Sequence, residues 1–131
     1  PTIKIVKIIA LSTKGLADLE PVKVFCEERG DLIVTSSSSN NIEINHINAQ
    51  KGIALAAYAK EKGIPMSETM AIGDNLNDYS MIEAAGIGVA MANAVPTITD
   101  LANYHTAKNT QDGVAQAIYH AIDLNQAAEK K

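Results

Sequence analysis

The polar run Gly73–Asp78, with the sequence GDNLND, constrains the fold more than any other part of the chain. It follows the apolar segment Met70–Ile72 and precedes a helical pattern over Tyr79–Ala85. Ligands of open parallel sheets bind beyond the carboxyl ends of the strands, so an apolar strand that runs into carboxylates is typical of an α/β site. Oxygen donors of this kind suit hard cations such as Mg²⁺. The run also fits a simple loop in which Asn77 or Asp78 caps the next helix, and the spacing alone leaves both interpretations open.

Lys51 stands at the start of a second helical stretch, Gly52–Lys62. The positive end of the helix dipole disfavours a cation there, and glycine is a poor helix former. A lysine at a helix N-terminus can hold an anion together with the free backbone N–H groups. The simpler alternative is that Lys51 extends into solvent, and the residue taken alone favours that alternative.

The chain before His46 predicts one small α/β unit. Its apolar patterns indicate a strand over 3–11, a helix over 16–29, and strands over 32–36 and 42–45 that pair as a hairpin. Cys26 lies in the helical pattern, which favours a buried, neutral thiol. We therefore expect the order strand–helix–strand–strand in this section.

Beyond His46 the pattern alternates between helices and short apolar strands. Strands are predicted over 70–73, 87–91 and 104–107, and helices over 52–62, 78–85, 96–103 and 110–124. In the last helix the residues expected to face inward are Val114, Ala117, Ile118, Ala121 and Ile122, and 126–131 is expected to be a frayed tail. This alternation predicts a parallel sheet built from right-handed crossovers. The expected division is 1–47 and 48–131, with the boundary near 46–49.

Composition excludes some classes of function. The 131 residues allow one modest domain or parts of two, and 47% apolar residues can form a core. A formal net charge of −4 argues against a nucleic-acid surface, and no run approaches the ~20 apolar residues of a membrane span. With a single cysteine, the composition suits a reducing cytoplasm. Because the chain opens directly in strand-like sequence, we expect it to be the middle of a longer protein.

Several separated motifs together resemble the C-terminal part of the haloacid dehalogenase (HAD) superfamily, specifically the Cof-type sugar-phosphate phosphatases with a large inserted α/β cap. The stretches that carry the resemblance are Glu43–Ile44, Lys51–Gly52, Ala54–Leu55, Gly73–Asp78 with Met81, Ala85–Gly86, Val89–Met91, Asn93–Ala94 and Asp112–Val114. Their order and spacing match over residues 42–118. The resemblance implies a HAD-like, Rossmann-like parallel sheet with helices on both faces, preceded by the last part of the cap (1–47). Ala92 replaces the family's glycine before Asn93, a small departure.

The resemblance also implies a role for each site residue. Lys51 would neutralise the charge of the nucleophile and the transferring phosphoryl group. Asp74 would bind Mg²⁺ directly, Asn77 would contact the phosphate, and Asp78 would orient both the metal shell and Lys51, so that Asp74 and Asp78 form the metal site. These roles suit phosphoryl transfer, because its catalysis depends on positioning and on electrostatic stabilisation.

The sequence departs from the family in one large respect, because it contains no Asp-x-Asp motif. In the family the first aspartate of that motif attacks phosphate to form an aspartyl-phosphate, and the second acts as general acid and base. We therefore expect the C-terminal half of a longer Mg²⁺-dependent phosphatase, cut inside the cap and inactive alone. Its substrate would be a sugar phosphate or another small phosphorylated metabolite, chosen by the cap.

Two other functions compete with this interpretation. One is a catalytically inactive module that binds a phosphate or a partner, and an Asp-x-Asp motif upstream in the parent gene would distinguish the two. The other is a receiver-like signalling domain, which is disfavoured because Lys51 precedes Asp74 rather than following the acceptor aspartate. Loss of the nucleophile strand beside the strand ending at Asp74 would leave an open sheet edge, through which we expect self-association.

Overall fold

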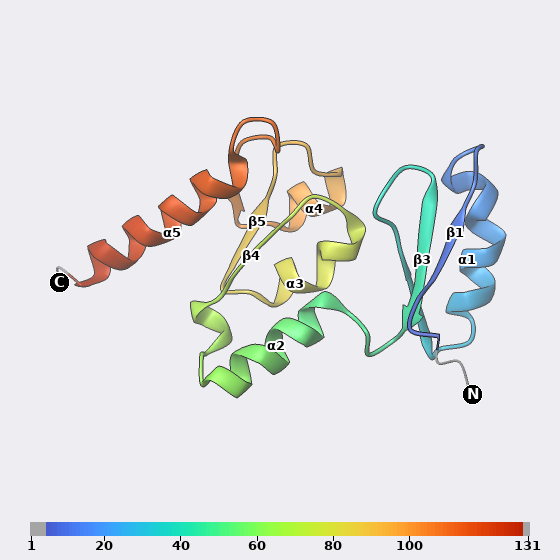
Figure 1. Ribbon diagram of the computed structural model, residues 1–131, viewed down its shortest axis with the longest axis horizontal. Coiled ribbons are helices and arrows are strands. Elements are labelled where there is room, and N and C mark those ends of the chain that lie inside the picture. Colours follow the sequence, from blue (N-terminus) through green and yellow to red (C-terminus); the bar gives the residue numbers. More distant parts are fainter. Residues whose placement is uncertain (1–4, 130–131) are drawn as a thin grey trace.

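The computed structural model of the protein describes residues 5–129 and contains two three-stranded sheets (Figure 1). The first is antiparallel with the order β1–β3–β2, and the second is parallel with the order β4–β5–β6. The α/β class and the parallel second layer predicted from the sequence are confirmed.

The antiparallel sheet contains β1 (Ile8–Leu11), β2 (Leu32–Thr35) and the central strand β3 (Asn41–His46). The predicted hairpin is confirmed, because β2 and β3 pair with Thr35 opposite Glu43. The first strand is shorter than predicted: it begins at Ile8, and residues 3 and 4 of the predicted strand lie outside the described residues. The predicted first helix consists of a 3-10 turn, η1 (Leu16–Leu19), followed by α1 (Glu20–Glu27), in which Pro21 occupies the first turn.

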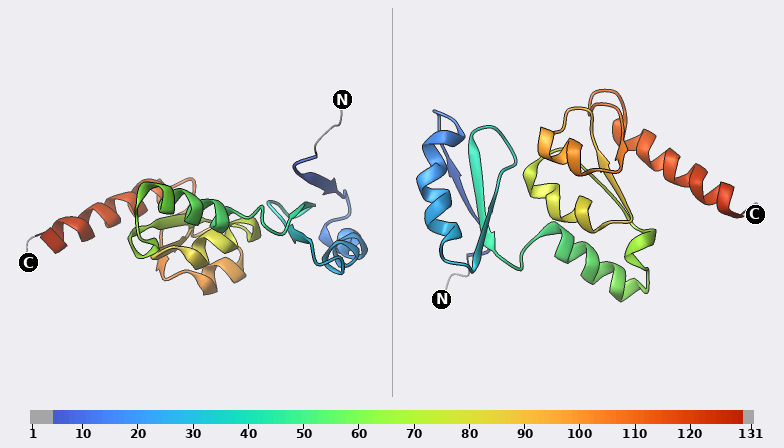
Figure 2. Two further views of the ribbon diagram at one scale, coloured as in Figure 1. Left: turned by 90° about the horizontal axis from the view of Figure 1, so that it is seen from below. Right: turned by 180° about the vertical axis from the view of Figure 1, so that it is seen from behind.

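The two faces of the antiparallel sheet differ in chemistry. Ile42 and Ile44 of β3 are buried together with Leu19 and Cys26, as expected for the thiol, in a small core under α1. Figure 2 shows α1 on the side of this sheet that is turned away from the parallel sheet. Because side chains alternate along a strand, Glu43 points to the opposite face, toward the rest of the molecule.

The parallel region begins with α2 (Lys51–Lys62) and continues through the strands β4 (Met70–Gly73), β5 (Ile87–Ala90) and β6 (Tyr104–His105). Between them lie η2 (Met66–Glu68), η3 (Leu76–Asp78), α3 (Tyr79–Ala84) and α4 (Pro96–Leu101). The side chains of Ala71, Ala90, Ile82 and Ile98 form a shared core between the sheet and the helices α3 and α4. Val89 alternates to the other face of β5 and is also fully buried, so both faces are covered at this strand.

The last helix, α5 (Gly113–Glu129), differs from its prediction at both ends and on its surface. It begins at Gly113 because Asp112 adopts a left-handed backbone with φ of 55°, and the expected tail is helical through Glu129. Ala117 is fully buried, but three residues predicted to face inward are 43–50% exposed, namely Val114, Ile118 and Ile122. Figures 1 and 2 show why: α5 extends away from the sheet. An apolar period predicts a helix but does not say what covers it.

Within residues 5–129, β4 pairs only with β5, so one edge of β4 has no strand beside it. The expected association through this edge stays a prediction, and light scattering at increasing protein concentration tests it: a rising mass supports association, and a constant monomer mass contradicts it. No helix in the described part of the chain is long and apolar enough to cross a membrane.

Candidate functional site

The loop after β4 folds back on itself through its own polar side chains. The Oδ1 atom of Asn75 accepts a hydrogen bond from the backbone N–H of Leu76 at 2.8 Å. The Oδ2 atom of Asp78 accepts hydrogen bonds from the backbone N–H groups of Asp74 at 3.0 Å and Asn75 at 3.3 Å. The predicted cap of the next helix is wrong, because Asp78 makes no side-chain hydrogen bond to the N-terminus of α3. Asn75 and Asp78 instead form a capping box around the preceding turn, η3.

Gly73 allows this loop to close. A Cβ atom at Gly73 would lie 2.4 Å from the Cβ atom of Asp78 and 2.6 Å from its Oδ2 atom, too close for any side chain. The glycine at the end of β4 is thus required by the close approach of Asp78, and it explains why the polar run begins with glycine.

Lys51 and Asp78, which are 27 residues apart, form an ion pair. The Nζ atom of Lys51 lies 2.5 Å from the Oδ1 atom of Asp78. The side chain of Asp78 is only 8% exposed, whereas that of Lys51 is 49% exposed, so the buried carboxylate is neutralised by an ammonium group that still reaches solvent. Lys51 thus reaches solvent, as the simpler alternative expected, but its ammonium group is also paired with Asp78.

Gly52 brings the start of α2 against α3. Its backbone N–H donates a hydrogen bond to the Oγ atom of Ser80 at 3.0 Å, and a Cβ atom there would lie 2.2 Å from the backbone oxygen of Ser80. This contact fixes the position from which Lys51 reaches Asp78. The sequence singled out Gly52 as a poor helix former, and the close packing of two helices is the physical reason for it. Ser80 was missed, since a serine early in a helix is a common surface residue.

Asp74 is held from a different direction. Its Oδ2 atom accepts a hydrogen bond from the Nδ2 atom of Asn93 at 2.8 Å, and its backbone oxygen accepts one from the N–H of Val95 at 2.9 Å. Asn93 in turn accepts the backbone N–H of Asn109 at 2.9 Å. The loops after β4, β5 and β6 therefore meet at this carboxylate. The sequence analysis assigned no role to Asn93, although its position just after a predicted parallel strand is typical of a site residue.

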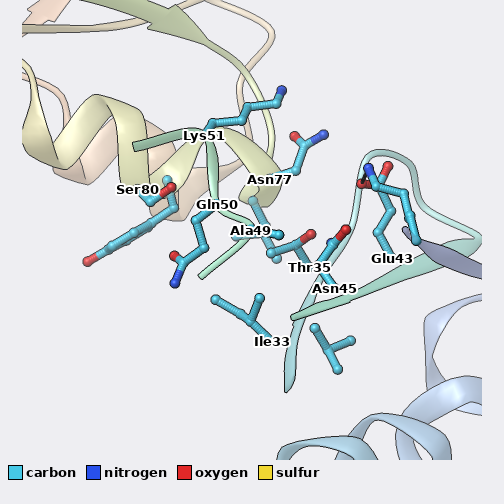
Figure 3. Close-up of a pocket in the computed structure, with 13 residues that line it drawn as sticks. Ile33, Thr35, Glu43, Asn45, Ala49, Gln50, Lys51, Asn77 and Ser80 are labelled. Atoms are coloured by element: carbon cyan, nitrogen blue, oxygen red, sulfur yellow. Dashed lines mark hydrogen bonds and ion pairs between the residues drawn. The ribbon is translucent and has the colours of Figure 1, made fainter. Parts of the chain in front are cut away.

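A cavity of about 310 Å³ lies between the antiparallel sheet and the start of α2 (Figure 3). Of the four predicted site residues, Lys51 and Asn77 line it, and Asp74 and Asp78 do not. Figure 3 shows Lys51 and Asn77 on one wall and Glu43 on the other, with Thr35 and Asn45 between Asn77 and Glu43 in this view. The two sheets thus contribute opposite walls of one space.

Glu43 is the most deeply buried charged group on the cavity wall. Its side chain is 8% exposed, and its Oε2 atom lies 2.6 Å from the Nζ atom of Lys7. The hydrogen bond from Lys7, together with one from Ser37, holds the pKa of Glu43 below its ordinary value, against the opposing effect of burial. The sequence included Glu43 among the motif residues but assigned it no role.

The carboxylates of the site differ in how many of their oxygens are engaged. Both oxygens of Asp78 accept hydrogen bonds, whereas the described contacts of Asp74 use only Oδ2. Among residues 5–129, no group of three or more His, Cys, Asp or Glu side chains gathers as a metal site would require. A cation at this place would therefore need ligands from outside these side chains.

Comparison with known proteins identifies the family. Residues 1–118 match the family of haloacid dehalogenase-like hydrolases. The chain belongs to this family. The chain is 47% identical over 92 residues to the 5-amino-6-(5-phospho-D-ribitylamino)uracil phosphatase of Bacillus subtilis (strain 168), an alignment that covers 70% of this chain and 37% of that protein.

Two solved structures of haloacid dehalogenase-like proteins resemble the chain in three dimensions. One, a haloacid dehalogenase-like hydrolase from B. subtilis, matches with a TM-score of 0.83 and 42% identity, over 88% of this chain and 40% of that one. The other, a sugar phosphatase of HAD subclass IIB, matches with a TM-score of 0.75 and 26% identity, over 88% of this chain and 42% of that one. The predicted fold and the Cof-type, subclass IIB membership are confirmed. The chain spans about two fifths of the length of these relatives.

Proposed function

We propose that the chain is part of a Mg²⁺-dependent phosphatase that hydrolyses small phosphorylated metabolites through an aspartyl-phosphate. The observation that carries the proposal is the ion pair of Lys51 with the buried Asp78, beside a cavity large enough for a small metabolite. The names of two similar proteins, a phosphatase of a phosphorylated uracil derivative and a sugar phosphatase, support the reaction class.

Lys51 and Asn77 are the residues that would hold the phosphoryl group, because both line the cavity. A transferring phosphoryl group spreads negative charge over its equatorial oxygens, which an ammonium group stabilises. The N-terminal N–H groups of α2 add partial positive charge at the same place. Asp78 keeps Lys51 in position, and its own orientation is fixed by the backbone N–H groups of Asp74 and Asn75.

The donor set fits Mg²⁺ with Asp74 as the direct ligand. Mg²⁺ in phosphate-handling sites is commonly held by one or two carboxylates, with waters and substrate phosphate completing the octahedron. Asp74 has a carboxylate oxygen outside its hydrogen bond with Asn93, whereas both oxygens of Asp78 are engaged. Asp78 would therefore contribute to the metal site by orienting the groups around the cation. When bound, the cation would neutralise charge on the phosphoryl oxygens.

The proposal also assigns different functions to the two parts of the chain. Residues 1–47 would be the end of the substrate-selecting cap, and residues 48–131 would belong to the catalytic core. The sequence contains no Asp-x-Asp motif, so the nucleophile and the general acid would come from a longer protein. On this proposal the chain binds phosphate but does not turn over.

The first experiment titrates the chain with inorganic phosphate, with Mg²⁺ and with chelator, by calorimetry and by amide NMR shifts. We expect the chain to bind phosphate more tightly when Mg²⁺ is present. Lys51→Ala should weaken phosphate binding at least tenfold, whereas Asp74→Ala should abolish only the effect of Mg²⁺ on the affinity. Lys60→Ala, an exposed lysine of the same helix, is the matched control. Phosphate binding that Lys51→Ala leaves unchanged would contradict the proposal.

A second measurement addresses turnover. Release of phosphate from an aryl phosphate should not exceed that of the Asp74→Ala variant. Mg²⁺-dependent turnover abolished by Asp74→Ala would show that a nucleophile lies within these residues. Phosphate binding that depends neither on Mg²⁺ nor on Asp74 would favour the alternative function, an inactive phosphate-binding module.

A further inference from the structure

One hydrogen bond joins the antiparallel and parallel regions. Among the hydrogen bonds of the described chain, only one crosses between residues 5–46 and residues 51–129: the backbone N–H of Asn77 donates to the backbone oxygen of Ser36 at 3.2 Å. Ser36 directly follows β2 and is 5% exposed. In Figure 1 the connection between β2 and β3 lies beside the loop that follows β4. The two regions therefore meet at the residue that the proposed function assigns to phosphate.

This hydrogen bond is also the external support of the loop backbone. Four N–H groups of the loop bond to acceptors within the loop itself, namely those of Asp74, Asn75, Leu76 and Asp78. Asn77 differs, because its N–H donates to Ser36. The turn η3 has only three residues, and so short a 3-10 turn has little rigidity of its own. The carbonyl of Ser36 thus fixes the position of the Asn77 backbone from outside the loop.

Leu76 adds an apolar contact surface at the same place. It is the only large apolar residue in the run Gly73–Asp78. Its side chain lines a second cavity, of about 110 Å³, whose other apolar walls all belong to the antiparallel region, namely Leu16, Leu19, Val34 and Ile42. Leu19 and Ile42 belong to the small core under α1, so Leu76 lies at the open end of that core. Burial of apolar surface there favours contact between the loop and the antiparallel region.

The position of this loop matters for the proposed phosphate site. The side chain of Asn77 lines the larger cavity beside Lys51, so a displaced backbone would move the amide away from that ammonium group. Small displacements of positioning groups cost much of their effect on a bound reactant. Ser36 does not line the larger cavity, and it contacts the site through Asn77 alone.

We propose that Ser36 and Leu76 are positioning residues, through which the antiparallel region holds Asn77 where it binds phosphate. The inference rests on the proposed function, because it needs phosphate at Lys51 and Asn77. Ser36 acts through its backbone oxygen, and Leu76 acts through its apolar side chain. By linkage, bound phosphate and the contact between the two regions stabilise each other by the same factor.

The test alters this contact from the antiparallel side. Leu16 lines the smaller cavity and not the larger one, so Leu16→Ala leaves the phosphate site itself unchanged. In calorimetric titrations with Mg²⁺ present, Leu16→Ala and Leu76→Ala should each weaken the binding of inorganic phosphate about threefold. The double variant should lose about fourfold rather than about ninefold, because both substitutions remove the same contact.

Two further variants separate positioning from general packing. Val22→Ala is the matched control, since Val22 of α1 is 40% exposed, as Leu16 is 38% exposed, and lines neither cavity. Its phosphate affinity should equal that of the unmodified chain. Leu16→Met keeps an apolar side chain of similar volume and should restore most of the affinity that Leu16→Ala loses. Circular dichroism establishes that each variant is folded.

Amide hydrogen exchange, followed by NMR, reports on the hydrogen bond without phosphate. The Asn77 amide should exchange about threefold faster in Leu16→Ala and in Leu76→Ala, because the contact opens more often. The amide of Met91 bonds the backbone oxygen of Gly73 within the parallel region, and its exchange rate should stay the same. Saturating phosphate should slow exchange at Asn77 in the unmodified chain.

The possible outcomes are distinguishable. If inorganic phosphate does not bind at all, the proposed function fails and this inference fails with it. If Lys51→Ala weakens phosphate binding but Leu16→Ala and Leu76→Ala do not, the inference alone is overturned. Weaker binding in those two variants with unchanged exchange at Asn77 would also overturn it, because the effect would not pass through the hydrogen bond to Ser36.

Discussion

The antiparallel and parallel regions of this molecule are packed to different degrees. The core under α1 is small, and its best buried residue, Ile42, is still 4% exposed. In the parallel region, by contrast, the large side chains of Val89 and Ile98 are fully buried. The residues proposed to hold phosphate thus belong to the better packed region, whereas Glu43 on the opposite cavity wall belongs to the less packed one.

The packing difference follows from how much sheet each region has. The antiparallel region has three short strands and one helix, so large apolar side chains such as Leu11 and Phe25 remain 70% and 68% exposed. The parallel region packs α3 and α4 on one face through Ala71 and Ile82. A close-packed frame fixes the geometry of the side chains that it carries, whereas a less closely packed one leaves them more freedom to move.

The largest effect should come from truncating the better packed core. Ile98→Ala removes a fully buried side chain, and we expect a loss of about 4 kcal/mol in the free energy of unfolding. Ile42→Ala, in the smaller core, should cost about 2 kcal/mol because the site is less tightly enclosed. Urea denaturation followed by circular dichroism measures both. Equal losses would contradict the difference in packing between the two regions.

The next largest effect concerns the buried carboxylate between the loop and α2. Asp78→Ala removes the partner of Lys51 and the acceptor of two backbone N–H groups, and should destabilise the protein by about 2–3 kcal/mol. Glu61→Ala breaks the exposed pair with Lys62 and should cost less than about 0.5 kcal/mol. Thermal denaturation of the two variants gives the comparison. A similar small cost for both would mean that the Lys51–Asp78 pair does not hold the site together.

The sequence predicted the elements of both regions better than it predicted what surrounds them. Strand β4 and helix α2 lie where their apolar periods place them, because those periods report local burial. The run Gly73–Asp78 was recognisable because glycine, amides and carboxylates at a strand end have few structural uses. The exposure of Ile118 on α5 was not predictable, since a helical period does not identify the surface that covers it.

The contacts of two residues at the site could not be predicted from the sequence. Asn93 contacts Asp74 across 19 positions of the sequence, and Glu43 faces the space beside Lys51 only because the antiparallel sheet turns that face toward α2. Both contacts depend on how separate elements pack, which local patterns do not encode. The ion pair of Lys51 with Asp78 has the same origin, although the family resemblance led to the expectation that Asp78 orients Lys51.

A smaller effect on stability, with a larger one on metal binding, is expected at Asn93. Asn93→Ala removes the hydrogen bond to the Oδ2 atom of Asp74 and should cost about 1 kcal/mol. Because it frees the proposed metal ligand, it should also weaken Mg²⁺ binding about tenfold in the presence of phosphate. Asn103→Ala is the matched control, since Asn103 bonds the backbone of Gly88 and Gly86, away from the site. Calorimetric titration with Mg²⁺ measures the affinity of each variant. Equal affinities of the two variants for Mg²⁺ would show that Asn93 has no role in the metal site.

The smallest effect is the acid sensitivity of the antiparallel region. The pKa of Glu43 is lowered mainly by the hydrogen bond from Lys7, so the unfolded chain binds more protons than the folded chain at acidic pH. The stabilisation is therefore complete above the ordinary glutamate pKa of about 4.3 and is lost as the pH falls through the lower pKa of the folded state. Because Lys7 is 43% exposed, we expect a contribution of about 0.5 kcal/mol.

Lys7→Met isolates that contribution. Removing the ammonium group should raise the pKa of Glu43, as measured by the NMR titration of its side-chain carboxyl carbon, and should make the unfolding free energy less dependent on pH below about 4.5. Lys14→Met, at an exposed position near the same sheet, should change neither quantity. If the pKa of Glu43 stays low without Lys7, the hydrogen bond from Ser37 is enough to hold the carboxylate in its charged form, and the expected role of Lys7 is wrong.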